Sequence, residues 1–198
     1  LLVAARVAES GLVRDANDTV GLAAAISIAL TLAEKADTRE RARALAARFA
    51  AQLFSREDPR LEVALVSALG ARRWRIALAE SCTGGGVAAR LTSVPGSSEV
   101  FREGWVTYSN EAKIRRLGVP QALLEAHGAV SREVAEAMAI GARRESGADL
   151  SLSVTGIAGP AGGSETKPVG LVWFGLADPS GVRSFLRRYP RHGRGSVG

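Results

Sequence analysis

The feature that most constrains the fold of this chain is the alternation of short apolar runs with helix-forming segments over residues 60–198. The apolar runs have the length of buried strands, and the segments between several of them have the spacing of helices. The predicted strands are Arg75–Ala79, Trp105–Tyr108, Leu150–Thr155, Val169–Leu176 and Val182–Tyr189. The predicted helices are Leu61–Leu69, Val87–Leu91 and a long helix capped by Ser131. This order indicates a three-layer α/β/α domain.

A small first region precedes this domain. Apolar residues alternate over 26–32, the period of a half-buried strand, and residues 39–53 are rich in helix formers. The segment Ser55–Pro59 then breaks the pattern. We therefore expect a small α+β domain over residues 1–58 and the main domain over residues 59–198. Because the chain begins without Met, we also expect a fragment of a longer protein, with the last helix of the main domain missing.

Composition excludes several classes of site and protein. The single cysteine, Cys82, cannot form an internal disulfide, and His127 and His192 lie too far apart in sequence to indicate a metal centre. We therefore expect neither a cofactor nor a metal. No stretch approaches the roughly 20 apolar residues of a membrane span, and the N-terminus lacks the basic start of a signal peptide. These features favour the cytoplasm and no membrane partner.

The make-up of the basic residues is uneven. The net charge is +6, and of 26 basic residues only Lys35, Lys113 and Lys167 are lysines. Arginine stays protonated, whereas burial or positive neighbours can lower the pKa of a lysine enough to leave some neutral amine. The composition therefore hints that a lysine in this chain is a place where arginine could not serve. A solvated lysine at a helix start is the alternative for Lys113.

The segment Ala79–Gly86 joins a predicted strand to a predicted helix and places Ser81 where a nucleophile would be useful. Helix N-terminal amides at such a junction can hold an anion or a developing oxyanion. A serine nucleophile needs a base, and since neither histidine has a supporting context, Lys113 is the candidate. Cys82 competes for the role of nucleophile, although a lone cysteine at a strand end is more often simply buried. A capped helix start packed by small residues is the alternative.

The segment Thr155–Gly170 follows another predicted strand and is rich in glycines and hydroxyl groups. Backbone N–H groups of such a loop can wrap a phosphorylated ligand. The segment matches neither a Walker A sequence nor a dinucleotide fingerprint, and its Gly156-x-x-Gly159 spacing is weak support for RNA binding. A plain flexible hairpin is the alternative.

Four motifs, taken in order, resemble the C-terminal domain of the CinA family over residues 60–198. The motifs are Glu80–Gly85, Pro95–Ser98, Tyr108–Lys113 and Val154–Gly170. This family contains the nicotinamide-nucleotide amidases, or NMN deamidases. Residues 1–58 resemble more weakly the small KH-type linker domain of full-length CinA proteins. If so, the chain lacks their N-terminal molybdopterin-binding-like domain.

The resemblance implies hydrolysis of the carboxamide of nicotinamide mononucleotide to nicotinic acid mononucleotide and ammonia, a reaction of pyridine nucleotide salvage. It implies that Ser81 is the nucleophile, Lys113 the general base and Tyr108 an assisting residue. We expect backbone donors near the Gly84–Gly86 turn to stabilise the oxyanion. The residues implied in substrate binding are Glu80, Thr83, Gly84, Gly85, Ser98, Thr155, Gly156, Gly159, Gly162, Gly163 and Arg194. The segment around Arg194 departs from the family pattern, because glycines replace an Asp and a second Arg.

Two other functions stay open at this point. One is a catalytically inactive nucleotide-binding domain of a competence/damage-inducible CinA protein, in which the altered Arg194 segment prevents turnover. The other is a nucleic-acid-binding module, motivated by the net charge and the KH-like region. That region has no evident GxxG clamp and few aromatic residues to stack on bases. We therefore expect a small nucleotide as the partner, not a nucleic acid, and a homo-oligomer of two or more chains.

Overall fold

The computed structural model describes residues 60–189. The chain divides into two compact units, Leu1–Ala68 and Leu69–Gly198, and helix α4 (Leu61–Arg72) spans the division. The small α+β domain predicted over residues 1–58 lies outside the described residues, as do its boundary with the main domain and residues 190–198. Within the described part, no helix has both the length and the apolar character needed to cross a membrane.

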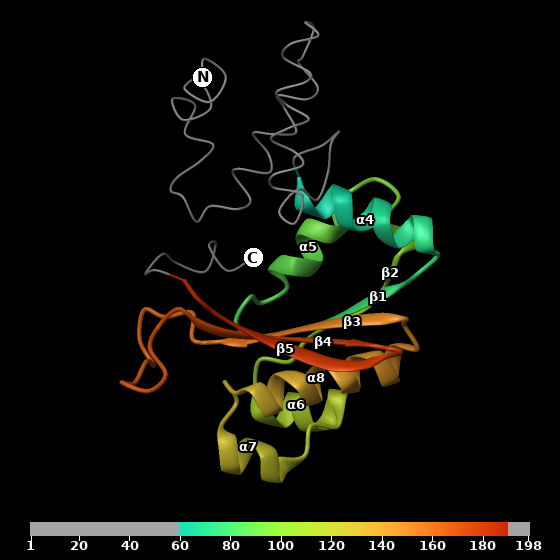
Figure 1. The fold of residues 1–198 in the computed structure, drawn as a ribbon. Coiled ribbons are helices and arrows are strands. Elements are labelled where there is room, and N and C mark those ends of the chain that lie inside the picture. Colours follow the sequence, from blue (N-terminus) through green and yellow to red (C-terminus); the bar gives the residue numbers. More distant parts are fainter. Residues whose placement is uncertain (1–59, 190–198) are drawn as a thin grey trace, which may run out of the picture. The chain divides into compact units, whose positions relative to one another are not determined.

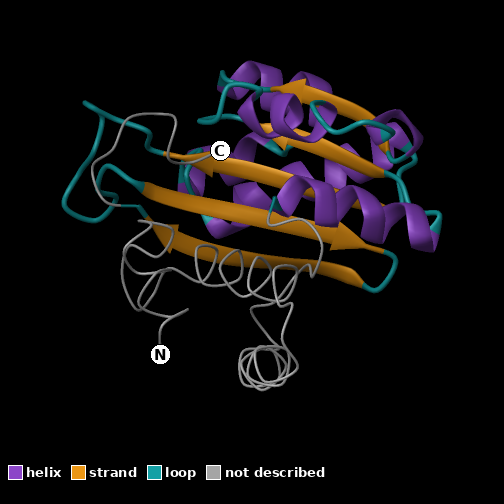
Figure 2. Ribbon diagram, turned by 90° about the horizontal axis from the view of Figure 1, so that it is seen from above, coloured by secondary structure: helices purple, strands orange, loops and turns teal. Residues whose placement is uncertain are grey.

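A mixed five-stranded sheet forms the centre of the second unit, with the order β2-β1-β3-β4-β5 (Figures 1 and 2). Its strands are β1 (Ile76–Glu80), β2 (Phe101–Val106), β3 (Leu150–Gly156), β4 (Leu171–Asp178) and β5 (Gly181–Arg188). Strand β1 runs parallel to β2 and β3, whereas β4 pairs antiparallel with both β3 and β5. The carboxyl ends of β1, β2 and β3 therefore meet at one edge of the sheet, where a site can form.

Helices lie on both faces of this sheet (Figure 1). One face carries α6 (Asn110–Leu117), α7 (Gln121–His127) and α8 (Arg132–Ser146), and the other carries α5 (Gly86–Thr92). A short 3₁₀ helix, η1 (Ser97–Glu99), precedes β2. Buried residues of β1, α6, α7 and α8 form one core cluster, while Cys82, Val154 and Val172 form another. The three-layer α/β/α fold is confirmed.

Helix α8 begins where the sequence predicts and packs tightly on the sheet. Its N-cap, Ser131, accepts a hydrogen bond from the Val134 N–H at 3.3 Å. Two alternate hydroxyls of β3 donate to carbonyls of α8, from Ser151 at 2.7 Å and from Ser153 at 2.5 Å. A Cβ at Gly175 of β4 would lie 2.4 Å from an α8 carbonyl oxygen, so only glycine allows this approach. The N-terminus of α8 is thereby fixed beside the carboxyl end of β3.

The predicted elements differ from the structure mainly at helix α4, at strand β2 and at two helices that were not predicted. Helix α4 continues through Gly70 to Arg72 instead of ending at the glycine. Strand β2 covers Phe101–Val106, not Trp105–Tyr108. It is an edge strand with mostly exposed residues, so its first half carries charge and lacks the apolar pattern of a buried strand. Helices α6 and α7 were not predicted as separate elements.

Candidate active site

Ser81 follows the last residue of β1, at the carboxyl end of the sheet. Its backbone N–H donates to the Val154 carbonyl at 2.9 Å, which extends the pairing of β1 with β3 by one residue. The chain then turns through Gly84 and Gly85, whose φ angles of 63° and 98° lie in the left-handed region that favours glycine. This turn starts α5 and leaves Ser81 lining a cavity.

The Glu80 carboxylate occupies the N-terminus of α5 and is only 1% exposed. It accepts hydrogen bonds from the N–H groups of Gly85 at 3.0 Å, Val87 at 3.1 Å and Ala88 at 2.8 Å. Helix N-terminal amides of this kind are the ones that can bind an anionic ligand. The Glu80 carboxylate therefore takes the place of an anionic ligand at this helix N-terminus and stabilises the turn that follows Ser81.

The amides of the Gly84–Gly86 turn are engaged within the protein. Two of them donate at 3.1 Å to the backbone carbonyls three residues earlier, and the third donates to Glu80. These three amides are therefore not free to bind an oxyanion, because a tight turn and a buried carboxylate each need donors. The wider expectation of backbone donors near this turn stays a prediction.

Lys113 lies in the first turn of α6, and its amine reaches the end of β1. Ser109 caps this helix, because its Oγ accepts a backbone N–H of the first turn at 3.1 Å. Lys113 Nζ donates to Ser81 Oγ at 3.2 Å. It also donates to the backbone carbonyls of Thr107 at 2.8 Å and Tyr108 at 3.3 Å. With 1% of its surface exposed, Lys113 is not the solvated lysine of the alternative interpretation.

Burial shifts the pKa values of the two titratable groups beside Ser81 in opposite directions. Desolvation lowers the pKa of Lys113 below its ordinary value of 10.5, and nearby Cys82 and Glu111 oppose part of this shift. Desolvation raises the pKa of the Cys82 thiol from 9.0 to about 11. The environment therefore raises the neutral fraction of Lys113 above that of a solvated lysine, and it keeps Cys82 protonated, which makes it a weak nucleophile.

A cavity of about 270 Å³ opens beside Ser81. The predicted site residues that line it are Ser81, Tyr108, Lys113, Thr155, Gly156 and Gly159. Those that do not line it are Glu80, Thr83, Gly84, Gly85, Ser98, Gly162 and Gly163. Arg194 lies outside the described residues. The structure thus brings the candidate nucleophile, base and assisting tyrosine to one cavity, together with part of the glycine-rich loop.

Thr155 lies at the end of β3 and lines this cavity, and its hydroxyl proton is already used in a hydrogen bond within the protein. Its Oγ1 donates to the Ala129 carbonyl at 2.8 Å, and the residue is fully buried. A hydroxyl whose proton is used in this way still has lone pairs to offer. Toward the cavity, Thr155 can therefore accept a hydrogen bond from a ligand N–H, but it cannot donate one to a carbonyl without breaking this contact.

Ser98 lies at the opposite end of the sheet from the cavity. It belongs to η1, which precedes β2, and the neighbouring Val100 carbonyl accepts a hydrogen bond from the N–H of Ile76, the first residue of β1. The cavity lies beyond the last residue of β1, so the two ends are separated by a strand length of roughly 15 Å. Sequence order placed Ser98 between two site motifs but did not reveal at which end of a strand it lies.

Apolar residues complete the cavity, namely Ala129, Val130, Ile157, Ala158 and Ala161. The last three lie in the 156–163 loop, which the resemblance implies at the pocket, whereas sequence reasoning missed the first two. None carries a functional group that would single it out; the signal for the first two is only their place before the Ser131 cap. In the residues that the structure describes, no group of three or more His, Cys, Asp or Glu side chains is arranged to hold a metal ion.

Sequence comparison finds similar proteins over the same part of the chain. The model of the CinA family, described as the CinA C-terminal domain, matches residues 58–197. A CinA-like protein of Geobacter sp. (strain M21) is 56% identical over 136 residues, which cover 69% of this chain and 33% of the relative. A CinA-like protein of Chlorobaculum tepidum is 50% identical over 161 residues, which cover 80% of this chain and 38% of the relative. The chain therefore spans little more than a third of the length of these relatives.

Solved structures share the fold as well. The crystal structure of competence/damage inducible protein CihA from Agrobacterium tumefaciens has a TM-score of 0.67 and 43% identity, covering 69% of this chain and 84% of that one. A competence-damaged protein (CinA) superfamily protein from Escherichia coli has a TM-score of 0.66 and 36% identity, covering 69% and 79%. The described domain is thus similar to these proteins in both sequence and fold.

Proposed function

Because the chain belongs to the CinA C-terminal domain family, we propose that this domain is an amidohydrolase of pyridine nucleotide salvage. Its substrate is nicotinamide mononucleotide, and its products are nicotinic acid mononucleotide and ammonia. The proposal concerns the domain described here, since the chain spans only about a third of its relatives.

The observation that carries the proposal is the buried contact of Lys113 Nζ with Ser81 Oγ at 3.2 Å. A neutral Lys113 takes the proton of the Ser81 hydroxyl, and Ser81 Oγ attacks the carboxamide carbon. The lowered pKa of Lys113 supports this role, because an amine must lose its charge before it can act as a base. The carbonyls of Thr107 and Tyr108 hold the amine in place through the reaction.

The oxyanion of the tetrahedral intermediate needs donors other than the Gly84–Gly86 amides. Lys113 becomes an ammonium after the first step and can donate to the new oxyanion, and the hydroxyl of Tyr108 at the cavity is a second donor. Lys113 then returns a proton to the leaving nitrogen, and ammonia departs. Water attacks the resulting acyl ester of Ser81, and Lys113 accepts the water proton. Lys113 then gives this proton to Ser81 Oγ as the ester bond breaks, so the carboxylic acid product leaves with the Ser81 hydroxyl and the neutral amine restored.

The cavity suits a carboxamide attached to a small aromatic ring. Its volume of about 270 Å³ lies close to the lower end of the range of about 300–1,000 Å³ for small-molecule sites. Tyr108 is 60% exposed at this cavity and offers an aromatic face to a positively charged pyridinium ring. Thr155 can accept a hydrogen bond from the amide NH₂, which distinguishes a carboxamide from its carboxylate product.

The direct test is incubation of the purified protein with nicotinamide mononucleotide and measurement of released ammonia. We expect Ser81→Ala and Lys113→Arg each to lower kcat by about 10³-fold or more. The matched control is Cys82→Ala beside the nucleophile, which should retain activity within about fivefold. Full activity in Ser81→Ala would remove the role of Ser81, and loss of activity in Cys82→Ala alone would make Cys82 the nucleophile. Tight binding without any ammonia release would favour an inactive nucleotide-binding domain.

A further inference from the structure

The two walls of the cavity come from segments far apart in the chain. One wall is the 127–131 segment between α7 and α8, which contributes Ala129 and Val130. The other is the 157–170 loop between β3 and β4, which contributes Ile157, Ala158, Gly159 and Ala161. The width of the opening between them therefore depends on what joins these two segments.

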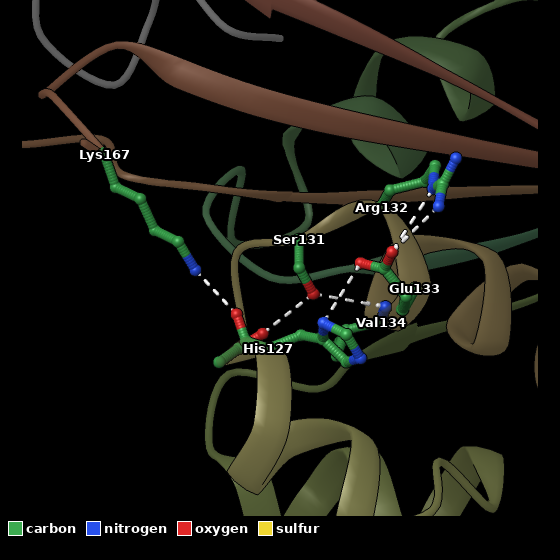
Figure 3. A network of polar contacts seen from close by, with 7 residues as sticks. His127, Ser131, Arg132, Glu133, Val134 and Lys167 are labelled. Atoms are coloured by element: carbon green, nitrogen blue, oxygen red, sulfur yellow. Dashed lines mark hydrogen bonds and ion pairs between the residues drawn. The ribbon is translucent and has the colours of Figure 1, made fainter.

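Three consecutive carbonyls of the 127–131 segment each accept a hydrogen bond from a side chain. The Gly128 carbonyl accepts from Ser131 Oγ at 2.9 Å, which is a contact within the segment. The Ala129 carbonyl accepts from Thr155 Oγ1 at 2.8 Å, at the buried end of the cavity. The His127 carbonyl accepts from Lys167 Nζ at 2.6 Å. This last hydrogen bond joins the 157–170 loop to the 127–131 segment (Figure 3).

The end of α7 is built to receive the Lys167 ammonium. His127 is the last residue of this helix, so its carbonyl carries part of the negative end of the helix dipole, where a cation is stabilised. The following Gly128 has φ 71°, and a Cβ there would lie 3.2 Å from Lys167 Nζ. The missing side chain of Gly128 therefore leaves room for the amine beside the carbonyl.

The 157–170 loop is anchored at its base and presents Lys167 from an ordered turn. At the base, the Gly170 N–H donates to the Ile157 carbonyl at 2.7 Å. Near Lys167, the Ser164 N–H donates to the Lys167 carbonyl at 2.9 Å, and the Lys167 N–H donates to Ser164 Oγ at 3.0 Å. Residues 160–166, which form the outer part of the loop, are exposed. The Lys167 side chain therefore joins this outer part to the 127–131 segment on the other side of the cavity.

We propose that Lys167 is a positioning residue that holds the 157–170 loop against the 127–131 segment and so sets the width of the cavity opening. It touches neither Ser81 nor Lys113, which lie on other elements, so it acts on access and binding and not on the chemical step. The effect on substrate affinity rests on the proposed function, whereas the effect on the opening does not.

The first experiment measures the opening without any substrate. Cys82 lines the cavity and is the single cysteine of the chain, so its alkylation by iodoacetamide, followed by intact mass spectrometry, reports access to the cavity. We expect Lys167→Gln to raise the alkylation rate by about 5- to 10-fold, because a charge-assisted hydrogen bond between the walls is lost. Lys167→Arg, which can still donate to the carbonyl, should stay within about twofold of the unsubstituted protein.

The matched control is Arg188→Gln. Arg188 lines a neighbouring cavity of about 480 Å³ together with Lys167, so this change removes a nearby positive charge without removing the contact to His127. Its alkylation rate should not change. An unchanged rate in Lys167→Gln, or an equal rise in Arg188→Gln, would overturn the proposal. Alkylation in mild urea, well below the unfolding transition, separates local opening from unfolding, since only unfolding makes the rate rise steeply with urea.

The second experiment uses turnover of nicotinamide mononucleotide. We expect Lys167→Gln to raise KM by about 5- to 10-fold while kcat stays within about twofold, because the Ser81–Lys113 contact is untouched. A fall in kcat at constant KM would contradict a positioning role. If the unsubstituted protein shows no turnover at all, the proposed function fails, and the alkylation result still decides the role of Lys167.

Discussion

Lys113 Nζ lies 3.2 Å from Ser81 Oγ, although the two residues come from different elements, α6 and the end of β1. Ser109 at the start of α6 and the Thr107 carbonyl at the end of β2 fix the lysine from its own side. The Glu80 carboxylate fixes the turn after Ser81 from the other side. The pair is therefore held by backbone and buried groups before any ligand binds, which is the preorganisation that catalysis requires.

The pH dependence of activity should report the neutral fraction of Lys113. Desolvation lowers the pKa of Lys113 below 10.5, and only the form without the proton can act as a base. We therefore expect kcat/KM to rise with pH, with a midpoint below pH 10.5, and to reach a plateau above that midpoint. A steady-state series in buffers of constant ionic strength measures the midpoint, and activity that is independent of pH over this range would exclude Lys113 as the base.

Glu80 should matter for stability more than for binding. Glu80→Gln replaces one acceptor oxygen with an NH₂ group that faces backbone donors, so we expect the free energy of unfolding to fall by about 2–3 kcal/mol. Urea denaturation of the folded protein gives this value. The matched control is Glu103→Gln on the exposed edge strand β2, which should stay within about 0.5 kcal/mol. Equal stability of the two variants would mean that the α5 amides do not depend on Glu80.

Cys82 should make a contribution to stability that disappears in alkali. Its pKa is raised from 9.0 to about 11 in the folded protein, so between these values the folded state keeps a proton that the unfolded state has lost. The contribution is complete below pH 9.0 and is lost as the pH rises through about 11. The stability difference between the unsubstituted protein and Cys82→Ala should therefore shrink by about 2 kcal/mol across this range. A difference that stays constant with pH would show an unshifted thiol.

Thr155 should act through its acceptor oxygen. Thr155→Val keeps the shape but leaves the Ala129 carbonyl without its donor, so we expect a loss of about 1–2 kcal/mol of stability and a fall in kcat/KM of about tenfold or more. Thr155→Ser keeps the hydroxyl and should recover most of both. If Thr155→Ser is as impaired as Thr155→Val, the methyl group is the important part and the hydrogen-bonding argument fails.

The sequence predicted the parts of the fold that local patterns control. The apolar strand that ends before Ser81, the strand predicted over Leu150–Thr155 and the Ser131 cap are local features, and all three were found close to where they were expected. The edge strand β2 was misplaced because exposure removes the apolar pattern on which strand prediction depends.

Only those parts of the site that depend on residue type and local motif could be predicted from the sequence. Ser81 and Lys113 stood out by their motifs and by the scarcity of lysine, but their contact depends on how α6 packs against β1. The burial of Glu80 and the position of Ser98 depend on the same three-dimensional arrangement, which the resemblance, implying substrate binding for both, did not reveal. The apolar walls carry no chemical signal at all.

The most direct test of the account is to look for a covalent intermediate on Ser81. The protein is mixed with nicotinamide mononucleotide, quenched in acid during turnover, digested, and analysed by peptide mass spectrometry. We predict an acyl ester formed from the pyridine carboxamide of the substrate, with ammonia lost, on the peptide that contains Ser81, and none on the same peptide of Lys113→Arg. Turnover at the normal rate in Ser81→Ala, or an acyl group on Cys82 in place of Ser81, would contradict it.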